Sequence, residues 1–543
     1  MNKYIFSGLS LAGGLAAALA WTEWCPGLIL LVALVPFLIL ENAIYIRRKS
    51  VTPISVFLYL LPGFLLFCML SMGWLRSASI TGAVIVIAGL TFIFSLIGWF
   101  AHLVRLSFGT VVALIVLVSL WLSLELITHN LDIITPWINL GNGLAKDIRF
   151  IQWYDITGTA GGTLWILISN ILLTTVLVNI SSGFRHIIKH LALWILIITI
   201  PAAISFSRYS KITPAINIAN EVVIIQPNFD PYTTKFTVPF RIQLQKTLSL
   251  AEISVTHNTK WLLTPETTVD DAVNEENMQQ NIYIRMVDAF VNKHPDTEVV
   301  TGMITYRAYP VPDEKPPGSA RFADSIKKYI THFNSALKID TSPHIEIYHK
   351  SKLVPGIEKQ WVEGPGRILV KILPFLGGSQ WGYGSQKVRT VFESHDHLVK
   401  AAPVICYESV FGSYVSDYIL NGAGLIFIIT NDGWWKNTNG YLQHFAYARL
   451  RAIENRRPVA RAGNTGISAF IDIKGNVISK TKWWTQGYLR GELIPETRIT
   501  FYTRYGDWLL KLGVAALLLS LLYISGLYLF RKYRKQGSAA FIS

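Results

Sequence analysis

The segment Ala402-Pro-Val-Ile-Cys-Tyr-Glu-Ser409 begins as a short apolar strand and ends in a thiol, a phenol, a carboxylate and a hydroxyl. Two shorter segments earlier in the chain, Thr264-Pro-Glu266 and Tyr348-His-Lys350, carry side chains of complementary chemistry. A cysteine acts as a nucleophile only where a base or a positive charge favours its thiolate. The three segments supply one thiol, one carboxylate and one amine: Cys406, Glu266 and Lys350.

The acid–base chemistry of these side chains assigns a role to each. Glu266, with a pKa raised by partial burial, can take the proton of the Cys406 thiol. Lys350 can stabilise the oxyanion of a tetrahedral intermediate, and its charge also favours the thiolate. The set therefore suits acyl transfer through a thioester. Each residue alone also suits an ordinary role, namely packing for the cysteine, a helix cap or loop for the glutamate and a surface charge for the lysine.

Two further carboxylates lie close to these segments. Cys406 and Glu408 are separated by one residue, so on a strand they would share one face while Tyr407 points the other way. Glu358 follows Lys350 after the tripeptide Leu-Val-Pro. The spacing therefore predicts that Glu408 lies on the same side of the strand as the thiol.

The block that contains all three segments alternates short apolar strands with helical periodicity, which is typical of a layered α/β domain. The predicted strands cover 221–226, 261–263, 298–302, 335–339, 345–348, 402–406 and 425–429. The predicted helices cover 237–256, 276–293 and 440–456, and a hairpin covers 467–478. Residues 307–330, rich in Pro, Gly and charge, are predicted to form a surface insertion.

The sequence outside this block is much more apolar. Of the 543 residues, 51% are hydrophobic and only 15% are charged, whereas soluble proteins carry about a quarter charged residues. A membrane-spanning helix needs about 20 mainly apolar residues. Eight segments qualify: 4–22, 26–41, 54–75, 82–104, 109–128, 161–180, 187–206 and 508–530. The first could instead be a signal peptide, but it shows no clear cleavage site and further membrane helices follow at once.

The basic residues of the short loops predict the orientation of these helices, because cytoplasmic loops are rich in Lys and Arg. With the N-terminus in the cytoplasm, the inside loops hold Lys3, Arg47, Arg48, Lys49, Arg105, Arg185, Lys189, Arg531, Lys532, Arg534 and Lys535. The outside loops hold only Arg76, Lys146 and Arg149. The sequence thus predicts three parts: a helix bundle at 1–207, an extracytoplasmic domain at 208–505, and a last helix with a basic cytoplasmic tail at 506–543.

The net charge of +15 needs no nucleic-acid partner, because much of it follows from membrane topology and the rest can attract anionic head groups. The sequence shows no Gly-rich phosphate loop and no RNA-binding signature, and we predict neither a cofactor nor a metal. Cys25 and Cys68 lie in or beside membrane helices and are predicted to be packing residues. Cys406 is then a lone cysteine in an oxidising compartment, which marks it as a candidate reactive thiol.

The motifs, taken in order, resemble the nitrilase superfamily. The resemblance is carried by Thr264-Pro-Glu266, Phe333-Asn-Ser-Ala336, Tyr348-His-Lys-Ser-Lys-Leu-Val-Pro355, Ile405-Cys-Tyr-Glu-Ser409, Thr430-Asn-Asp-Gly-Trp434 and Arg461-Ala-Gly-Asn-Thr-Gly466. The membrane segments narrow it to the membrane-embedded apolipoprotein N-acyltransferases. Two stretches outside the α/β block, Thr135-Pro-Trp-Ile-Asn-Leu-Gly141 and Asp155-Ile-Thr-Gly158, also resemble that family. Each motif alone is weak, but their combined order is specific and covers nearly the whole chain.

The resemblance implies a nitrilase-like αββα sandwich on eight membrane helices, seven before it and one after it, in the bacterial inner membrane. It implies a two-step reaction in which a cysteine takes an acyl chain from a phospholipid, typically phosphatidylethanolamine, and passes it to the N-terminal amine of a diacylglyceryl-cysteine lipoprotein. Carried over by motif, the catalytic residues are Glu266, Lys350 and Cys406. Residues implied to support the site are Glu358, Tyr407 and Glu408. Residues implied to bind substrate are Trp434, Asn334 and Phe236.

The chain departs from the family pattern in two places. After Leu-Val-Pro the family often has Phe-Gly-Glu, whereas this chain has Gly356-Ile-Glu358, which retains the carboxylate. Near 232–236, where the family often has a tryptophan, Phe236 is the candidate substitute. Residues 359–392, rich in glycine and aromatic residues, are predicted to form a mobile lid at the membrane, or alternatively a packed arm of the domain. Glu125 lies inside a predicted membrane helix, where a functional role and an interfacial hydrogen bond are both open.

Two other functions share part of this pattern. A membrane-anchored nitrilase-type amidohydrolase would use the same three residues, although a single helix would suffice to anchor it. A transporter with an outer binding domain would need paired charges or broken helices near the middle of the membrane. The predicted helices before residue 207 carry almost no ionisable residues there, which disfavours the transporter.

Overall fold

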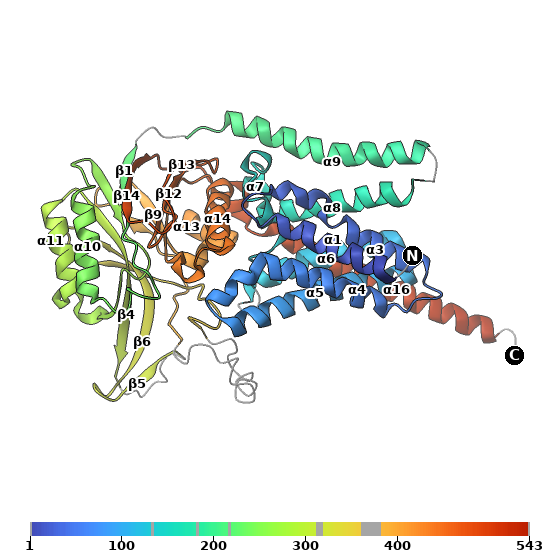
Figure 1. Ribbon diagram of the computed structural model, residues 1–543, viewed down its shortest axis with the longest axis horizontal. Helices are drawn as coiled ribbons and strands as arrows, with labels where there is room; N and C mark the ends of the chain where they lie inside the picture. Colours follow the sequence, from blue (N-terminus) through green and yellow to red (C-terminus); the bar gives the residue numbers. More distant parts are fainter. Residues whose placement is uncertain are drawn as a thin grey trace.

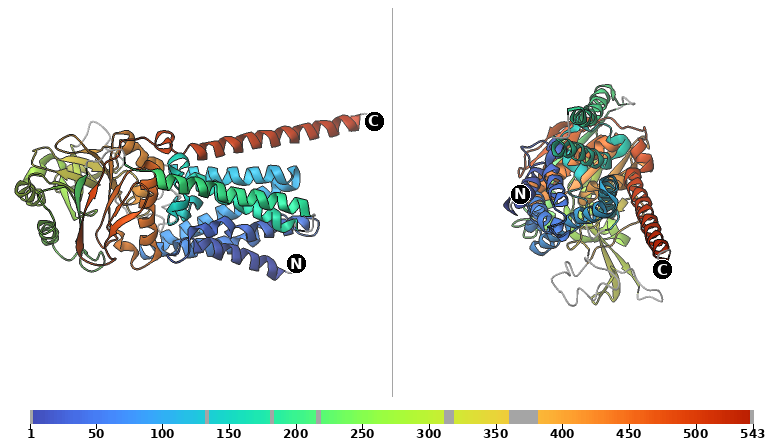
Figure 2. Two further views of the ribbon diagram at one scale, coloured as in Figure 1. Left: turned by 90° about the horizontal axis from the view of Figure 1, so that it is seen from above. Right: turned by 90° about the vertical axis from the view of Figure 1, so that its right-hand side faces the viewer.

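The computed structural model describes residues 3–131, 135–180, 184–214, 219–310, 319–359 and 382–540. A bundle of long helices and an α/β sandwich lie end to end along the long axis of the molecule (Figure 1). Both termini lie at the end of the bundle away from the sandwich, as a second view also shows (Figure 2). The chain thus leaves the bundle once, builds the sandwich and returns.

All eight apolar segments form helices, so the predicted membrane bundle is confirmed. The bundle comprises α1 (Lys3–Leu19), α2 (Leu30–Ala33), α3 (Val35–Ile46), α4 (Ile54–Met72), α5 (Ile80–Phe108), α6 (Thr110–Asn130), α8 (Thr159–Val178), α9 (Phe184–Lys211) and α16 (Trp508–Ala540). Short helices lie between them: η1 (Gly27–Ile29), η2 (Gly73–Ser77), η3 (Leu140–Leu144), η4 (Ile148–Phe150) and α7 (Tyr154–Thr157). Among the residues that the structure describes, seven apolar helical spans are long enough to cross a membrane, and the first apolar helix, Tyr4–Leu19, is shorter.

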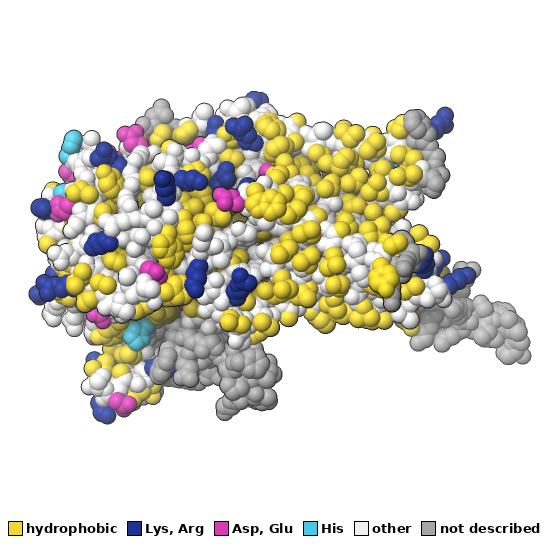
Figure 3. All heavy atoms as spheres, viewed as in Figure 1, with side chains coloured by type: hydrophobic (Ala, Val, Ile, Leu, Met, Phe, Trp, Pro, Cys, Tyr) yellow, Lys and Arg dark blue, Asp and Glu magenta, His cyan; other side chains and the backbone are white. Residues whose placement is uncertain are grey.

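Apolar side chains cover the outside of this bundle. Figure 3 shows a continuous hydrophobic band over the helices, with Lys and Arg at the end away from the sandwich. Leu519 and Leu522 on α16, for example, are 67% and 69% exposed. Exposed leucines at this density suit hydrocarbon rather than water.

The sandwich contains two sheets. The first has the order β14 (Gly487–Leu493), β1 (Asn220–Gln226), β2 (Thr259–Leu263), β4 (Glu298–Tyr309), β6 (Lys328–Ile339) and β5 (Arg321–Ala323), with β3 (Val269–Asn274) beside β4 and β7 (Glu346–His349) beside β6. The second has the order β13 (Val477–Lys480), β12 (Ala469–Ile471), β11 (Val459–Gly463), β10 (Leu425–Thr430), β9 (Lys400–Ile405) and β8 (Phe392–Glu393). β1, β2 and β4 run parallel, as do β9, β10 and β11.

Helices cover the outer face of each sheet, which completes four layers. α10 (Phe240–Glu252) and α11 (Ile282–Lys293), with η5 (Glu275–Gln280), lie on the first sheet, and α13 (Gly412–Leu420) and α14 (Asn439–Asn455) lie on the second, facing the bundle (Figure 1). η8 (Cys406–Val410), η9 (Asp432–Trp435) and α15 (Phe501–Tyr505) are short connections. The predicted αββα sandwich is therefore confirmed.

Alternation along β1 shows how the sequence builds these layers. Val223 and Ile225 belong to the apolar core beneath α10 and α11, whereas Val222 and Ile224 belong to the core between the sheets. Because successive strand residues point to opposite faces, one apolar run fills two cores. In the inner core, the ring of Trp261 meets the ring of Phe427 of the other sheet at 5.2 Å.

One prediction about this domain is wrong in part. Residues 307–330 were expected to form a surface insertion, but β4 continues to Tyr309 and β6 begins at Lys328. The two strands pair in register out to Tyr309 opposite Tyr329, and β5 adds a third strand. Pairing of backbone groups, which the Pro and Gly content does not reveal, extends the sheet here. Residues 311–318 of this segment, and most of the predicted lid at 359–392, lie outside the described residues.

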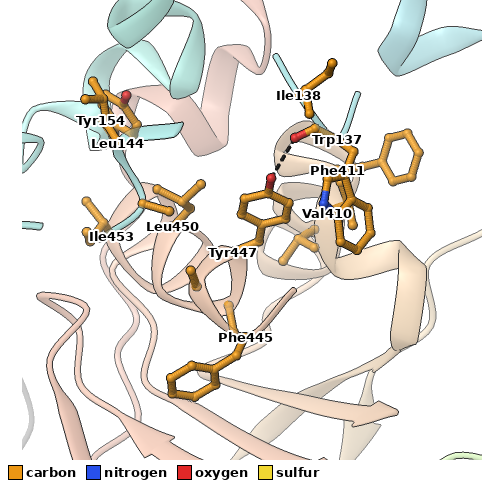
Figure 4. Close-up of a cluster of buried hydrophobic side chains, with 14 of the residues drawn as sticks. Trp137, Ile138, Leu144, Tyr154, Val410, Phe411, Phe445, Tyr447, Leu450 and Ile453 are labelled. Atoms are coloured by element: carbon orange, nitrogen blue, oxygen red, sulfur yellow. Dashed lines mark hydrogen bonds between the residues drawn. The ribbon is translucent and has the colours of Figure 1, made fainter. Parts of the chain in front are cut away.

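The loop between α6 and α8 joins the bundle to the sandwich. Figure 4 shows Trp137, Ile138 and Leu144 from this loop packed against side chains of η8 and α14, with the Tyr447 hydroxyl pointing at the Trp137 carbonyl. That hydrogen bond measures 2.6 Å, and Gln443 accepts another from the Trp137 indole at 2.7 Å. Glu125, inside α6, accepts from the backbone of Leu140 at 3.0 Å. The junction is thus apolar with buried hydrogen bonds, which fixes the sandwich on the bundle.

Candidate active site

Three strand ends bring the predicted catalytic residues together. Glu266 follows β2, Lys350 follows β7 and Cys406 follows β9. Side chains just beyond the ends of strands are held by the sheet yet point into a shared space, which suits a reaction centre. All three side chains are buried in the structure.

Lys350 lies at the centre of this group. Its Nζ donates to Oε1 of Glu266 and to Oε1 of Glu358, each at 2.9 Å. Burial by itself would lower the pKa of Lys350, but the two carboxylates and the nearby Cys406 raise it well above its ordinary value. The amine therefore remains a cation throughout the physiological range.

Glu266 is held as an anion in the same cluster. Burial favours its neutral form, but the Lys350 charge and the hydrogen bonds of Lys350 and Asn334 outweigh burial and lower the pKa of Glu266 below its usual value. Its second oxygen, Oε2, accepts from the backbone N–H of Asn431 at 3.1 Å. The prediction of a raised pKa is therefore wrong, because the sequence does not reveal how many donors reach this carboxylate.

Asn334 completes the cluster from the middle of β6. Its Nδ2 donates to Glu266 at 2.8 Å and to Glu358 at 3.0 Å, so it bridges the same two carboxylates as Lys350. The resemblance implied a substrate-binding role for Asn334, and the structure places it within the carboxylate cluster. Glu358 is also fixed by the backbone of Val354, whose N–H donates to Oε2 at 2.9 Å.

Cys406 has an unusual backbone and a protonated thiol. Its φ of 51° lies in the left-handed region, which costs a non-glycine residue about 1–3 kcal/mol and is concentrated at functional sites. Burial and the Glu266 charge raise the pKa of the thiol well above its ordinary value, while Lys350 opposes them. A thiol in this state needs a base before it can attack.

Glu408 and Tyr407 point in opposite directions because they lie on a turn, and not because they alternate along a strand. β9 ends at Ile405 and Cys406–Val410 forms a 3-10 turn, so the prediction that Cys406 and Glu408 share a strand face is wrong. Glu408 is fully buried and accepts hydrogen bonds from the Ile405 N–H at 2.9 Å and the Ser351 N–H at 2.7 Å. It thereby ties the Cys406 turn to the loop after Lys350.

Three tyrosines complete the surroundings of Glu408. Hydroxyls donate to its carboxylate from Tyr348 at 2.7 Å, Tyr414 at 2.6 Å and Tyr418 at 3.4 Å. A carboxylate with this many donors is a positioning group and has no lone pair free to act as a base. Glu408 therefore holds the loop after Lys350 and the turn at Cys406 together.

A second buried network lies behind Cys406, and sequence reasoning assigned it no role. His444 contacts the carbonyl oxygen of Cys406 at 3.1 Å and Asp432 at 2.9 Å, and Asp432 pairs with Arg461. Burial would raise the pKa of Asp432, but Arg461 and His444 lower it to about 2. Asp432 and Arg461 stand in two of the motifs that carry the family resemblance, which is the signal that could have identified them.

An apolar pocket joins the thiol to the membrane helices. Its wall is built from Met72, Trp74, Leu75, Ala78, Ser79, Gly82, Ala83, Val86, Thr135, Trp137, Val354, Pro355, Gly356, Ile357, Cys406, Tyr407 and Trp435. Tyr407 points toward the bundle, and its hydroxyl donates to Thr135 at 3.1 Å. α5 and the α6–α8 loop thus contribute directly to the space in front of Cys406.

Trp434 and Phe236 lie elsewhere. Their rings are 6.0 Å apart in an exposed aromatic group with Tyr232, whose hydroxyl donates to the Trp434 carbonyl at 2.6 Å. Neither residue is part of the pocket wall; the adjacent Trp435 is. The sequence Gly433-Trp-Trp435 does not reveal which of the two indoles faces the thiol. No group of three His, Cys, Asp or Glu side chains among the described residues could hold a metal ion.

Known proteins match both parts of the chain. The Carbon-nitrogen hydrolase family matches residues 313–500, and the Apolipoprotein N-acyltransferase N-terminal domain matches residues 13–172. The apolipoprotein N-acyltransferase of Chlorobaculum tepidum is 30% identical over 479 residues, which cover 84% of this chain and 85% of that protein. That of Geobacter metallireducens is 26% identical and covers 73% and 72%.

A nitrilase-superfamily structure, Saccharomyces cerevisiae Nit3, is 13% identical with a TM-score of 0.38 and covers 52% of this chain and 93% of its own. The Chlorobaculum match is the informative one, because it extends over the helices as well as the sandwich. Of the two family matches, one lies in the bundle and the other in the second part of the sandwich. The chain therefore belongs to the apolipoprotein N-acyltransferase family.

Proposed function

We propose that Cys406 is the nucleophile, Glu266 its base and Lys350 the oxyanion partner in the reaction of this family. The enzyme transfers a fatty acyl chain from a phospholipid to the N-terminal amine of diacylglyceryl-cysteine in an apolipoprotein. One observation carries the assignment of residues. Nζ of Lys350 lies 2.9 Å from the Glu266 carboxylate. The charge of Cys406 affects the pKa of Lys350, and the charge of Lys350 affects the pKa of Cys406. The three side chains therefore lie close together, at the end of an apolar pocket.

In the first step, Sγ of Cys406 attacks the ester carbonyl of the phospholipid as Glu266 takes the thiol proton. The oxyanion lies against the Lys350 ammonium. Collapse of the tetrahedral intermediate breaks the ester C–O bond, and the proton passes from Glu266 to the leaving alkoxide. The products of this step are a thioester on Cys406 and a lysophospholipid.

In the second step, the α-amine of the lipoprotein attacks the thioester carbonyl. Glu266 accepts the proton of the attacking amine, and Lys350 again holds the oxyanion. The C–S bond breaks, an amide forms, and the thiolate recovers its proton from Glu266. One carboxylate thus serves as base and then acid in both steps, which needs a pKa that depends strongly on its neighbours.

The position of the site suits two lipid substrates. A soluble domain would have to extract both from the bilayer, whereas here the helices α4 and α5 form part of the pocket itself. We propose phosphatidylethanolamine as the donor. We also place the sandwich on the outer face of the inner membrane with both termini in the cytoplasm, because the basic loop residues gather at the far end of the bundle.

The purified protein incubated with phosphatidylethanolamine, without acceptor, is expected to gain the mass of one fatty acyl group. Intact mass spectrometry measures the increment, and hydroxylamine should remove it because thioesters are labile to that nucleophile. The increment should be absent from the Cys406→Ala variant, and a diacylated lipopeptide should discharge it. If no phospholipid gives an adduct while simple amides release ammonia, the amidohydrolase alternative replaces this proposal.

The apolar pocket gives a second expected result, for Val86→Trp on α5. The larger ring fills space in front of Cys406, so thioester formation from a long-chain phospholipid should fall by roughly tenfold or more, about the effect of 1.4 kcal/mol. A short-chain soluble ester should react nearly as fast as with the unmodified enzyme. The two rates are compared by intact mass spectrometry over time.

Val84→Trp is the matched control for this experiment. Val84 lies on the same helix but is 61% exposed and takes no part in the pocket wall. It should leave both rates unchanged. If Val86→Trp lowered the rate of thioester formation equally with the long-chain phospholipid and the short-chain ester, the pocket would not hold the acyl chain.

A further inference from the structure

A second cavity, of about 470 Å³, lies inside the helix bundle at the end away from the sandwich. It is bounded by residues of α3, α4, α5, α6 and α8, and it shares no wall residue with the pocket at Cys406. We refer to it as the distal cavity. Its volume is within the range of sites for small molecules, which is about 300–1,000 Å³.

The deep end of the distal cavity is apolar and aromatic. Phe37, Phe64, Phe94 and Trp121 form this wall. Phe94 and Trp121 stack at 5.0 Å with their planes 2° apart, and Phe37 and Phe64 stack at 4.4 Å. Apolar cavities of this kind do not hold water and accept hydrocarbon instead.

The opposite end of the cavity is charged. Glu41 accepts from Arg105 at 2.5 Å and contacts His102 at 2.7 Å, and Arg105 also donates to Asn42 at 2.8 Å and to Thr110 at 3.2 Å. His102 is 1% exposed, Arg105 14% and Glu41 18%. Arg105 lies in the last turn of α5, at the end of the bundle where lipid head groups lie, and basic pockets between membrane helices at this level can bind such head groups.

The charge at this end is positive. The single carboxylate, Glu41, already binds Arg105 and His102. The ring of Tyr45, which lines the cavity, has the guanidinium of Arg105 at 3.9 Å and that of the exposed Arg48 at 4.7 Å. A guanidinium has five N–H donors, and the hydrogen bonds of Arg105 to described residues use one at each nitrogen. Donors therefore remain for a phosphate oxygen.

We propose that the distal cavity binds an anionic phospholipid, with one acyl chain against the aromatic wall and the phosphate at Arg105. The charged end of the cavity suits the head group of that lipid, and the aromatic end suits an acyl chain. The positive charge at Arg105 favours a head group with a net negative charge. The lipid comes from the leaflet opposite the sandwich and does not react, because Cys406 opens into a different pocket. This site is independent of the proposed catalytic roles.

The test uses the full chain as Cys406→Ala, so that the probe is not turned over. The protein is placed in phosphatidylcholine nanodiscs with a trace of phosphatidylglycerol that carries a diazirine on one acyl chain, irradiated, digested and mapped by mass spectrometry. Labelling is read on the α8 peptide that contains Asn170 and Ile171, which line the cavity. We expect that peptide to be labelled, and excess unlabelled phosphatidylglycerol to suppress the label more than excess phosphatidylcholine does.

Leu117→Trp on α6 should fill the cavity and lower this labelling by about tenfold, the effect of 1.4 kcal/mol. Ile115→Trp is the matched control, since Ile115 is 48% exposed on the same helix and does not line the cavity. Arg105→Gln should remove the preference for phosphatidylglycerol but leave labelling by a diazirine fatty alcohol. If Leu117→Trp and Ile115→Trp label equally, the lipid is only annular and the proposal is wrong.

Discussion

Lys350→Met is expected to reduce thioester formation by at least about 10²–10³-fold, which is the effect of removing a single oxyanion donor. It should also destabilise the fold by about 3–5 kcal/mol, because loss of one partner leaves buried charge uncompensated. The structure makes this loss severe, since Glu266 and Glu358 both depend on the same ammonium. The rate of acyl-enzyme formation is measured by intact mass spectrometry, and stability by denaturant unfolding.

Lys338→Met separates the chemical effect from the structural one. Lys338 is also buried in the sandwich and also serves several carboxylates, with Glu298 at 3.1 Å, Asp340 at 2.9 Å and Glu346 at 2.8 Å. The same substitution there should cost a similar amount of stability but leave the thioester rate of the folded protein unchanged. If both variants lose the rate to the same extent, Lys350 is only a structural cation.

The membrane bundle was predictable almost completely from the sequence. Length and apolarity fix a membrane helix without reference to its neighbours, so segments such as 54–75 and 508–530 could be recognised alone. The end of α16 shows the limit of this reasoning. The helix continues to Ala540, well past the apolar stretch, because backbone hydrogen bonding does not depend on apolarity.

The residues of the candidate site were predictable, but their electrostatics and supporting contacts were not. The order of motifs identified Glu266, Lys350 and Cys406, and the structure brings them together. The pKa of Glu266 is lowered mainly by the charge and hydrogen bond of Lys350 and also by the hydrogen bond of Asn334, and both residues lie far from Glu266 in the sequence. Long-range contacts of this kind leave no periodic signal in one sequence.

The turn at Cys406 shows the same limit at a smaller scale. Strand alternation was the only available basis for placing Glu408, but the strand stops one residue before the cysteine. The left-handed φ of Cys406 redirects the chain, and neither propensity nor pattern predicts a strained cysteine. Departures from local rules are concentrated at functional sites, so this failure itself agrees with a catalytic role.

Glu266→Gln is expected to lower thioester formation at neutral pH by about 10²–10⁴-fold, the usual contribution of a general base. The amide keeps an oxygen to accept from Lys350 and Asn334, so the cluster should remain assembled. The loss is large because burial holds the pKa of the Cys406 thiol well above its ordinary value. Without a base, almost no thiolate exists at neutral pH.

The unmodified enzyme and Glu266→Gln should differ in how the rate of thioester formation depends on pH. The pKa of Glu266 is lowered, so in the unmodified enzyme the base is ionised at neutral pH and the rate should fall only in acid, below the usual range of glutamate. In Glu266→Gln that acid limb should vanish, and the rate should climb with pH toward the raised pKa of the thiol. Initial rates measured with a soluble ester across a pH series distinguish the two profiles.

Glu358→Gln is the matched comparison, because Glu358 is the other carboxylate bound to Lys350 at 2.9 Å. After burial, the charge of Glu266 is the largest influence on the pKa of Cys406, whereas Glu358 acts on Lys350. Glu358→Gln should therefore lower the rate less and keep the acid limb. If Glu358→Gln instead abolished that limb and Glu266→Gln retained it, the roles of the two carboxylates would be reversed and Glu358 would be the base.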